Sequence, residues 1–114
     1  MSTLLEKKCT ACELGAPLVP DKDQIILLKD LDGWLIDKLN ISKLIKTFQF
    51  SNYEQTLKFV NLIAELAESE DHHPKITFEW GTASIEWWSH KIEGLHMNDF
   101  ICAAKSDEIY DSLN

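Results

Sequence analysis

The chain has 114 residues, of which 45% are hydrophobic and 26% charged, and these values fit one globular domain with a single core. A formal net charge of -8 repels phosphate backbones and anionic lipid headgroups, so we do not expect direct binding to nucleic acid or membranes. No apolar run approaches the roughly 20 residues that cross a bilayer, and residues 1–8 lack the apolar stretch of a signal peptide. We therefore expect a cytoplasmic protein.

The chain contains three cysteines, Cys9, Cys12 and Cys102. This small, odd number argues against a disulfide framework and fits a reducing compartment. Cys9 and Cys12 form a CxxC pair, but a structural zinc site usually needs a second pair of ligands, and a thioredoxin-like redox motif needs a βαβ context. We therefore expect no metal or redox role for this pair, and such a role is kept only as the alternative.

The first 20 residues predict an irregular arm laid over a domain of residues 21–114, because they combine the CxxC pair with Gly15, Pro17 and Pro20. Residues 21–31 predict a short helix. Its apolar side chains recur at helical spacing, and its first turn is acidic, where the helix dipole favours negative charge. Gly33 is expected to end this helix.

Two strands are expected next, at residues 34–36 and 44–50, where apolar side chains are frequent or alternate. A short connection would make them antiparallel. A helix over residues 41–46 is the competing interpretation. We assign Trp34 to the core rather than to a ligand site, as is usual for large aromatic side chains.

The clearest helical pattern covers Tyr53 to Ala67, after a capping-box spacing from Ser51 to Glu54. The side chains of Tyr53, Leu57, Val60, Ala64 and Ala67 form one apolar flank, and those of Phe59, Leu62 and Leu66 form a second. So wide a stripe indicates either a deeply buried helix or a subunit contact. We expect a homo-oligomer, and the alternative is that the arm covers the second flank with Leu4, Leu5, Leu14 and Leu18.

Alternation predicts two further strands, at residues 76–80 and 83–87, joined by a turn at Gly81-Thr82. Residues 97–113 predict a closing helix. The element order is then α-β-β-α-β-β-α. Short links between the strands predict an α+β two-layer sandwich, in which an antiparallel four-stranded sheet has three helices on one face.

Three of the four histidines are expected at one end of this sheet. His73 precedes Gly81 by eight residues and His90 follows Thr82 by eight, so a hairpin would bring His72, His73 and His90 together. Histidine has an unperturbed pKa near 6.5, which suits acid/base catalysis. The alternatives are that His72 caps a helix end and His90 is a solvated strand end, or that the histidines bind zinc, although no HxH or HExxH spacing occurs.

The histidines belong to a longer, dispersed pattern that comprises Glu68, His72-His73-Pro74, Trp80, Ser89-His90, Gly94-Leu95 and Asp99. This pattern resembles the signature of the pterin-4a-carbinolamine dehydratases. Further similarity at Gly33-Trp34, Phe48-Gln49-Phe50, Phe59-Val60 and Ala103-Ala104-Lys105 extends the resemblance from about Leu5 to the end of the chain. The arm with Cys9 and Cys12 is similar to that of many bacterial members.

Five positions depart from the family pattern or are unusual near the site. Ser89 replaces a usual Thr but keeps the hydroxyl, and His96 replaces the Thr that ordinarily caps the last helix. A capping box between His96 and Asp99 would compensate for that replacement. Lys75 stands where relatives commonly have an acidic residue or Asn, and the Trp87-Trp88 pair is bulky near the site. The sequence therefore does not decide how wide the rim of the pocket is.

The resemblance implies an enzyme that dehydrates 4a-hydroxytetrahydropterin to quinonoid dihydropterin without a metal or redox cofactor. It implies that His72 and His90 are the general acid/base pair and that His73 holds the substrate. Asp71, Glu68 and Asp99 would orient the imidazoles, and Asp99 would equally serve as a helix cap. The residues expected to line the pterin pocket are Asp71, Trp88, Ser89 and Lys91.

The family likeness also bears on partners. Members form dimers or tetramers, and the dehydration follows turnover of an aromatic amino acid hydroxylase, so a functional link to such an enzyme is expected. Animal members also act as dimerisation cofactors of a transcription factor. A protein-binding adaptor is therefore the alternative function.

Overall fold

The computed structural model describes residue 4 and residues 17–113. In chain order its elements are α1 (Asp21–Leu28), β1 (Leu35–Asp37), β2 (Lys43–Gln49), α2 (Tyr53–Glu70), β3 (Lys75–Glu79), β4 (Thr82–Trp87), the 3-10 turn η2 (His90–Ile92) and α3 (Met97–Ser112). The predicted order α-β-β-α-β-β-α and the α+β class are confirmed. The extended backbone of β2 excludes the alternative helix over residues 41–46.

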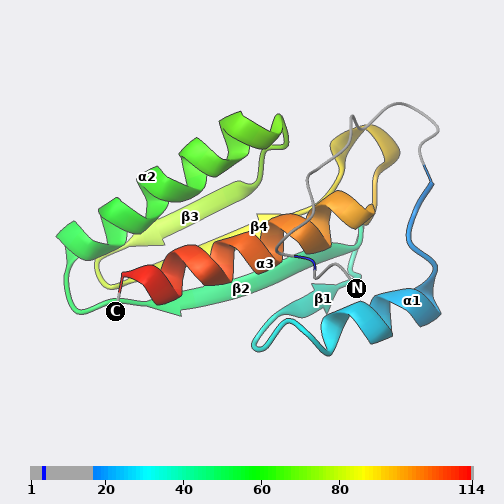
Figure 1. The fold of residues 1–114 in the computed structure, drawn as a ribbon, viewed down its shortest axis with the longest axis horizontal. Coiled ribbons are helices and arrows are strands. Elements are labelled where there is room, and N and C mark those ends of the chain that lie inside the picture. The colour runs from blue at the N-terminus through cyan, green and yellow to red at the C-terminus, as the bar shows by residue number, and fades with distance from the viewer. Residues whose placement is uncertain (1–3, 5–16, 114) are drawn as a thin grey trace.

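The four strands form one antiparallel sheet in the order β1-β2-β4-β3. The register from Leu44↔Trp87 to Gln49↔Thr82 places β4 beside β2, and β3 pairs with the outer side of β4. Helices α2 and α3 lie over one face of the sheet, and α1 lies beside the edge strand β1 (Figure 1). The two edges of the sheet are therefore β1 and β3.

The core lies between the sheet and the two covering helices. Its largest fully buried side chains include Trp87 of β4, Phe59 of α2 and Phe100 of α3. Trp34 is also buried, and its Nε1–H donates to the carboxylate of Asp107. The assignment of Trp34 to the core is thus confirmed.

The hairpin between β3 and β4 turns at Trp80-Gly81, one residue earlier than predicted. Gly81 has a φ of 81°, in the left-handed region that glycine adopts without strain. Its N–H donates to the Thr56 hydroxyl at 3.2 Å, which fixes the turn under α2. The other end of this hairpin carries the histidines.

Helix α1 is shorter than predicted and differs in its buried face. It ends at Leu28 rather than Leu31, and the side chains of Ile25 and Ile26 are 63% and 61% exposed. The residue that α1 buries is Gln24, whose Nε2–H donates to the carbonyl of Val19. A helix at the edge of the sheet covers little of the core, so only Leu27 and Leu28 of the predicted apolar stripe pack against it, and both are partly buried.

Helix α2 begins with a different cap and turns a different flank to solvent than predicted. Asn52, not Ser51, is the N-cap, and its side chain accepts from the N–H of Gln55 at 2.8 Å. Phe59, assigned to the second flank, is fully buried. The outward side of the helix instead carries Tyr53 and Leu57, which are 47% and 40% exposed.

The N-terminal arm is described only in part. Leu4 is buried in the core, whereas Leu18 is 52% exposed. Leu5, Leu14 and the pair Cys9 and Cys12 lie outside the described residues. Within the described residues, no helix is long and apolar enough to span a membrane.

Candidate functional site

His72 is placed by the end of α2. Asp71 adopts a left-handed conformation with a φ of 49°, which reverses the chain, and the backbone N–H of His72 then donates to the Ala67 carbonyl at 3.1 Å. The backbone therefore caps the helix, and the buried imidazole stacks on Trp87 with ring centroids 5.6 Å apart. The alternative in which the His72 side chain caps α2 is wrong.

Asp99, in the first turn of α3, forms a hydrogen bond with the His72 imidazole. Its Oδ1 lies 2.6 Å from Nε2 of His72, while its Oδ2 accepts from the Ser89 hydroxyl at 2.8 Å and from the His96 N–H at 2.9 Å. The side chain of His96 completes the predicted capping box, since its Nδ1 accepts from the N–H of Asn98. Asp99 thus caps α3 and hydrogen-bonds the His72 imidazole at the same time.

His73 lies at the surface beside the last turn of α2. Its Nε2 is 2.7 Å from Oε1 of Glu68, and both side chains are more than half exposed. Glu68 therefore contacts His73, not His72. Of the three histidines, it is thus the outer one that Glu68 is placed to orient.

His90 follows β4 on the turn η2. Its Nε2 lies 3.2 Å from the carbonyl oxygen of His73, and its ring packs on that of Trp88 with centroids 4.3 Å apart. An isolated bridge between Ser89 and Gly94 closes this turn. His90 is exposed, but it is held on two sides, so it is not simply a solvated strand end.

The three imidazoles share one feature. In each, Nε2 faces an oxygen: the Asp99 carboxylate for His72, the Glu68 carboxylate for His73 and the His73 carbonyl for His90. These oxygens accept hydrogen bonds, so a neutral imidazole donates Nε2–H and carries its lone pair on Nδ1. In all three clustered histidines the lone pair is therefore carried by the same nitrogen, Nδ1.

The remaining predicted residues lie around this cluster. Asp71 precedes His72, and Lys91 follows His90; both side chains are exposed. Lys75, at the start of β3, lies 3.9 Å from the carboxylate of Glu86 on β4. Ser89 is buried and donates to Asp99, which makes it a structural partner of the carboxylate.

The sequence assigned no role in the site to Trp87, and it assigned His96 only to a capping box. Trp87 stacks on the His72 ring, and the backbone N–H of His96 donates to Asp99. Alternation along β4 indicates that Trp87 points into the core, but it does not reveal which side chain stacks there. The capping-box spacing was the one usable signal for His96.

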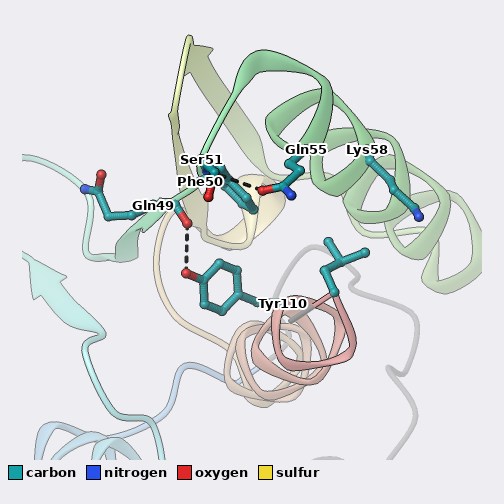
Figure 2. A pocket seen from close by; sticks show the side chains of 7 residues that line it. Gln49, Phe50, Ser51, Gln55, Lys58 and Tyr110 are labelled. Carbon is teal, nitrogen blue, oxygen red and sulfur yellow. Dashed lines mark hydrogen bonds between the residues drawn. The ribbon is translucent and has the colours of Figure 1, made fainter.

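Two cavities lie elsewhere in the molecule. One of about 460 Å³ opens between α2, α3 and the end of β2, and Figure 2 shows Phe50, Gln55, Lys58 and Tyr110 around it. The other, of about 470 Å³, is lined mainly by α1 and the residues before it, together with His96 and Met97. Among the described residues, no group of three or more His, Cys, Asp or Glu side chains is arranged to hold a metal ion.

The family model of the pterin 4 alpha carbinolamine dehydratases matches residues 17–109, which include every element that forms the histidine cluster. The chain belongs to this family. A Vibrio cholerae relative named as a pterin-4-alpha-carbinolamine dehydratase is 51% identical over 105 residues, covering 91% of this chain and 96% of its own. A Chlorobium luteolum relative of the same name is 42% identical, covering 99% of this chain and 100% of its own.

Two solved structures share the fold. A transcriptional coactivator/pterin dehydratase from Brucella melitensis superposes with a TM-score of 0.78 at 22% identity, over 82% of this chain and 99% of its own. A pterin dehydratase-like protein described as a RuBisCO assembly factor in the alpha-carboxysome gives a TM-score of 0.60 at 26% identity, over 68% of this chain and 89% of its own. The first of these likenesses establishes the fold alone.

Proposed function

We propose that the protein dehydrates 4a-hydroxytetrahydropterin to quinonoid dihydropterin. The observation that carries this proposal is the cluster of His72, His73 and His90, in which each Nε2 is bound to an oxygen and each Nδ1 is left for proton transfer. Membership of the pterin-4a-carbinolamine dehydratase family supplies the substrate class. The family alone does not supply the geometry.

The reaction requires two proton transfers. An imidazolium donates a proton from Nδ1 to the hydroxyl on C4a, so that the C4a–O bond breaks and water leaves as the N5 lone pair forms the double bond. A neutral imidazole then accepts the N5 proton at its own Nδ1. No change of oxidation state occurs, and exchange with solvent restores both histidines.

His72 and His90 are the proposed acid/base pair. Asp99 can hold the His72 ring in either charge state, because its carboxylate accepts from Nε2–H of both the neutral and the charged imidazole. The His73 carbonyl serves His90 in the same way. His73 is proposed to hold the substrate, with Asp71, Trp88 and Lys91 along the same rim.

We also propose that the protein acts as a homo-oligomer and that its product returns to the pterin pool used by an aromatic amino acid hydroxylase. A role as a protein-binding adaptor is the rival function. An adaptor would be indifferent to loss of His72, whereas the dehydratase would not. This difference separates the two functions in one variant.

The direct test follows the decay of 4a-carbinolamine absorbance in stopped flow, with and without purified protein. We expect the protein to accelerate the decay and a chelator to leave the rate unchanged, since no step is routed through a metal. A decay rate equal to the buffer rate would contradict the proposal. Loss of the acceleration in chelator would contradict the metal-free mechanism.

A further inference from the structure

Trp88 lies between the end of β4 and His90 in the chain. Trp87, the last residue of β4, is fully buried in the core, and Trp88, one residue later, is partly buried and packs against that core. Its ring is partly buried and packs on the imidazole of His90, with centroids 4.3 Å apart and planes inclined by 34°. Trp88 is thus the side chain on which the His90 ring rests.

Lys43, the first residue of β2, contacts the same indole from the neighbouring strand. Leu44 and Trp87 are the last pair of the β2–β4 register, and Lys43 and Trp88 are the residues next to them, so their side chains extend from the same face. The Lys43 ammonium nitrogen lies 4.4 Å from the centroid of the Trp88 ring, within the range of a cation–π interaction. A residue far from the histidines in the sequence therefore reaches the site.

His90 needs such support because its backbone gives little. It lies exposed on the short turn η2, and among the described residues its side chain forms a single hydrogen bond, to the His73 carbonyl at 3.2 Å. A single hydrogen bond fixes one atom of the imidazole, and the ring can still rotate about that atom. Packing against the Trp88 indole restricts this rotation, provided that the indole is itself held in place.

We propose that Lys43 is a positioning residue of the site, which holds the Trp88 indole by its ammonium group and thereby holds the His90 imidazole. The expected effect on kcat rests on the proposed function, whereas the packing of Lys43, Trp88 and His90 does not. Lys43 takes no part in proton transfer. Its role is to keep Nδ1 of His90 in one place while Nε2 stays on the His73 carbonyl.

The structural part is tested by nuclear magnetic resonance of the ring protons of His90, without substrate. These protons lie against an indole face, so ring-current shielding displaces their resonances. We expect Lys43→Met, which keeps the chain length and removes the charge, to move the His90 resonances toward those of an unstacked imidazole. Lys43→Arg should retain the displacement, since guanidinium also binds aromatic faces.

Two controls separate this effect from misfolding. Lys58→Met makes the same charge change at the opposite end of the sheet, beside the cavity of Figure 2, and should leave His90 unchanged. The His72 resonances, displaced by Trp87 in the core, report whether the fold is intact. An unchanged His90 spectrum in a folded Lys43→Met protein would overturn the proposal.

The kinetic part uses a double-mutant cycle. We expect Lys43→Met to lower kcat about three- to fivefold, the size that a partly exposed cation–π contact can support, with little change in KM and with recovery in Lys43→Arg. On a Trp88→Leu background, Lys43→Met should have no further effect, because it acts through the indole. Additive losses, or a changed His90 spectrum with an unchanged kcat, would overturn the positioning role. A wild-type protein without activity would refute the proposed function and leave the spectroscopic test standing.

Discussion

Asp99 is a fully buried carboxylate whose desolvation is offset by three donors. An ionised carboxyl group in a protein interior is strongly unfavourable unless hydrogen bonds and a paired group replace its hydration. The His72 imidazole, the Ser89 hydroxyl and the His96 N–H provide that replacement from three separate connecting segments of the chain. The same contacts tie the end of β4 and the start of α3 to the loop that carries His72.

We predict that Asp99→Asn lowers both stability and kcat. An amide has the shape of the carboxylate, but its NH₂ group would face a donor on one side of the site. The cost of such an unsatisfied buried group is about 1–3 kcal/mol in the free energy of unfolding, measured by urea denaturation. Asp107→Asn is the matched control, because Asp107 lies on the same helix as Asp99 but away from the histidines. Its carboxylate accepts from the side chains of Lys46 and Trp34. It should cost stability and leave kcat intact; equal kcat losses in both variants would refute the role of Asp99.

The three histidines should respond differently to truncation. We predict that His72→Ala and His90→Ala each lower kcat about 10²- to 10⁴-fold, because a proton-transfer group acts in the transition state. His73→Ala should mainly raise KM, since a group that holds the substrate contributes to both states. Steady-state kinetics on the carbinolamine distinguishes the two effects. Small and equal losses in all three variants would exclude the catalytic assignment.

The residues of the site were found from the sequence more readily than their contacts. Hairpin spacing and the family pattern both pointed to His72, His73 and His90, and the structure brings them to one end of the sheet. The pairing of Glu68 with His73, and the reach of Lys43 to Trp88, depend on side-chain directions and on which strands are neighbours. No periodicity in one chain carries that information.

Among the elements, the strands and the two covering helices were predicted to within a few residues, since their apolar periodicity reflects burial against one core. The strand order was not predicted. The chain offers no local signal that β4 inserts between β2 and β3, because that choice follows from packing the whole sheet under α2 and α3. Helix caps were also ambiguous, as the start of α2 shows.

The cap of α2 gives a prediction at this scale. Ser51 and Asn52 are adjacent, and each is a good N-cap residue, but only the Asn52 side chain accepts from the N–H of Gln55. We expect Asn52→Ala to lower the free energy of unfolding by about 1 kcal/mol, because an N–H of the first turn loses its acceptor. Urea denaturation should show no comparable loss for Ser51→Ala. A larger effect of Ser51→Ala would restore the capping box predicted from the sequence.

At the scale of the whole molecule, the histidine cluster and an exposed apolar patch lie in different places. The histidine cluster occupies the end of the sheet where β2 and β3 begin and β4 stops, next to the last turn of α2 and the first turn of α3. Along the side where α2 lies over β3, apolar side chains are left exposed: Tyr53 47%, Leu57 40%, Phe78 38% and Trp80 66%. Tyr53 and Phe78 pack together with ring centroids 6.0 Å apart, so this patch is continuous across helix and strand.

We predict that two copies of the chain associate through this patch and the neighbouring edge strand β3. An edge strand presents unpaired backbone groups, and pairing across a two-fold axis would satisfy them while burying the apolar side chains beside them. Sedimentation equilibrium at micromolar concentration should give a mass that is a multiple of the 13.1 kDa chain. Leu57→Glu should lower that mass, because it places a charge on the outward side of α2. Leu39→Glu changes a leucine that is 92% exposed between β1 and β2 and should leave the mass unchanged. A wild-type mass of one chain would refute association, and an oligomer that survives Leu57→Glu would move the contact to another surface.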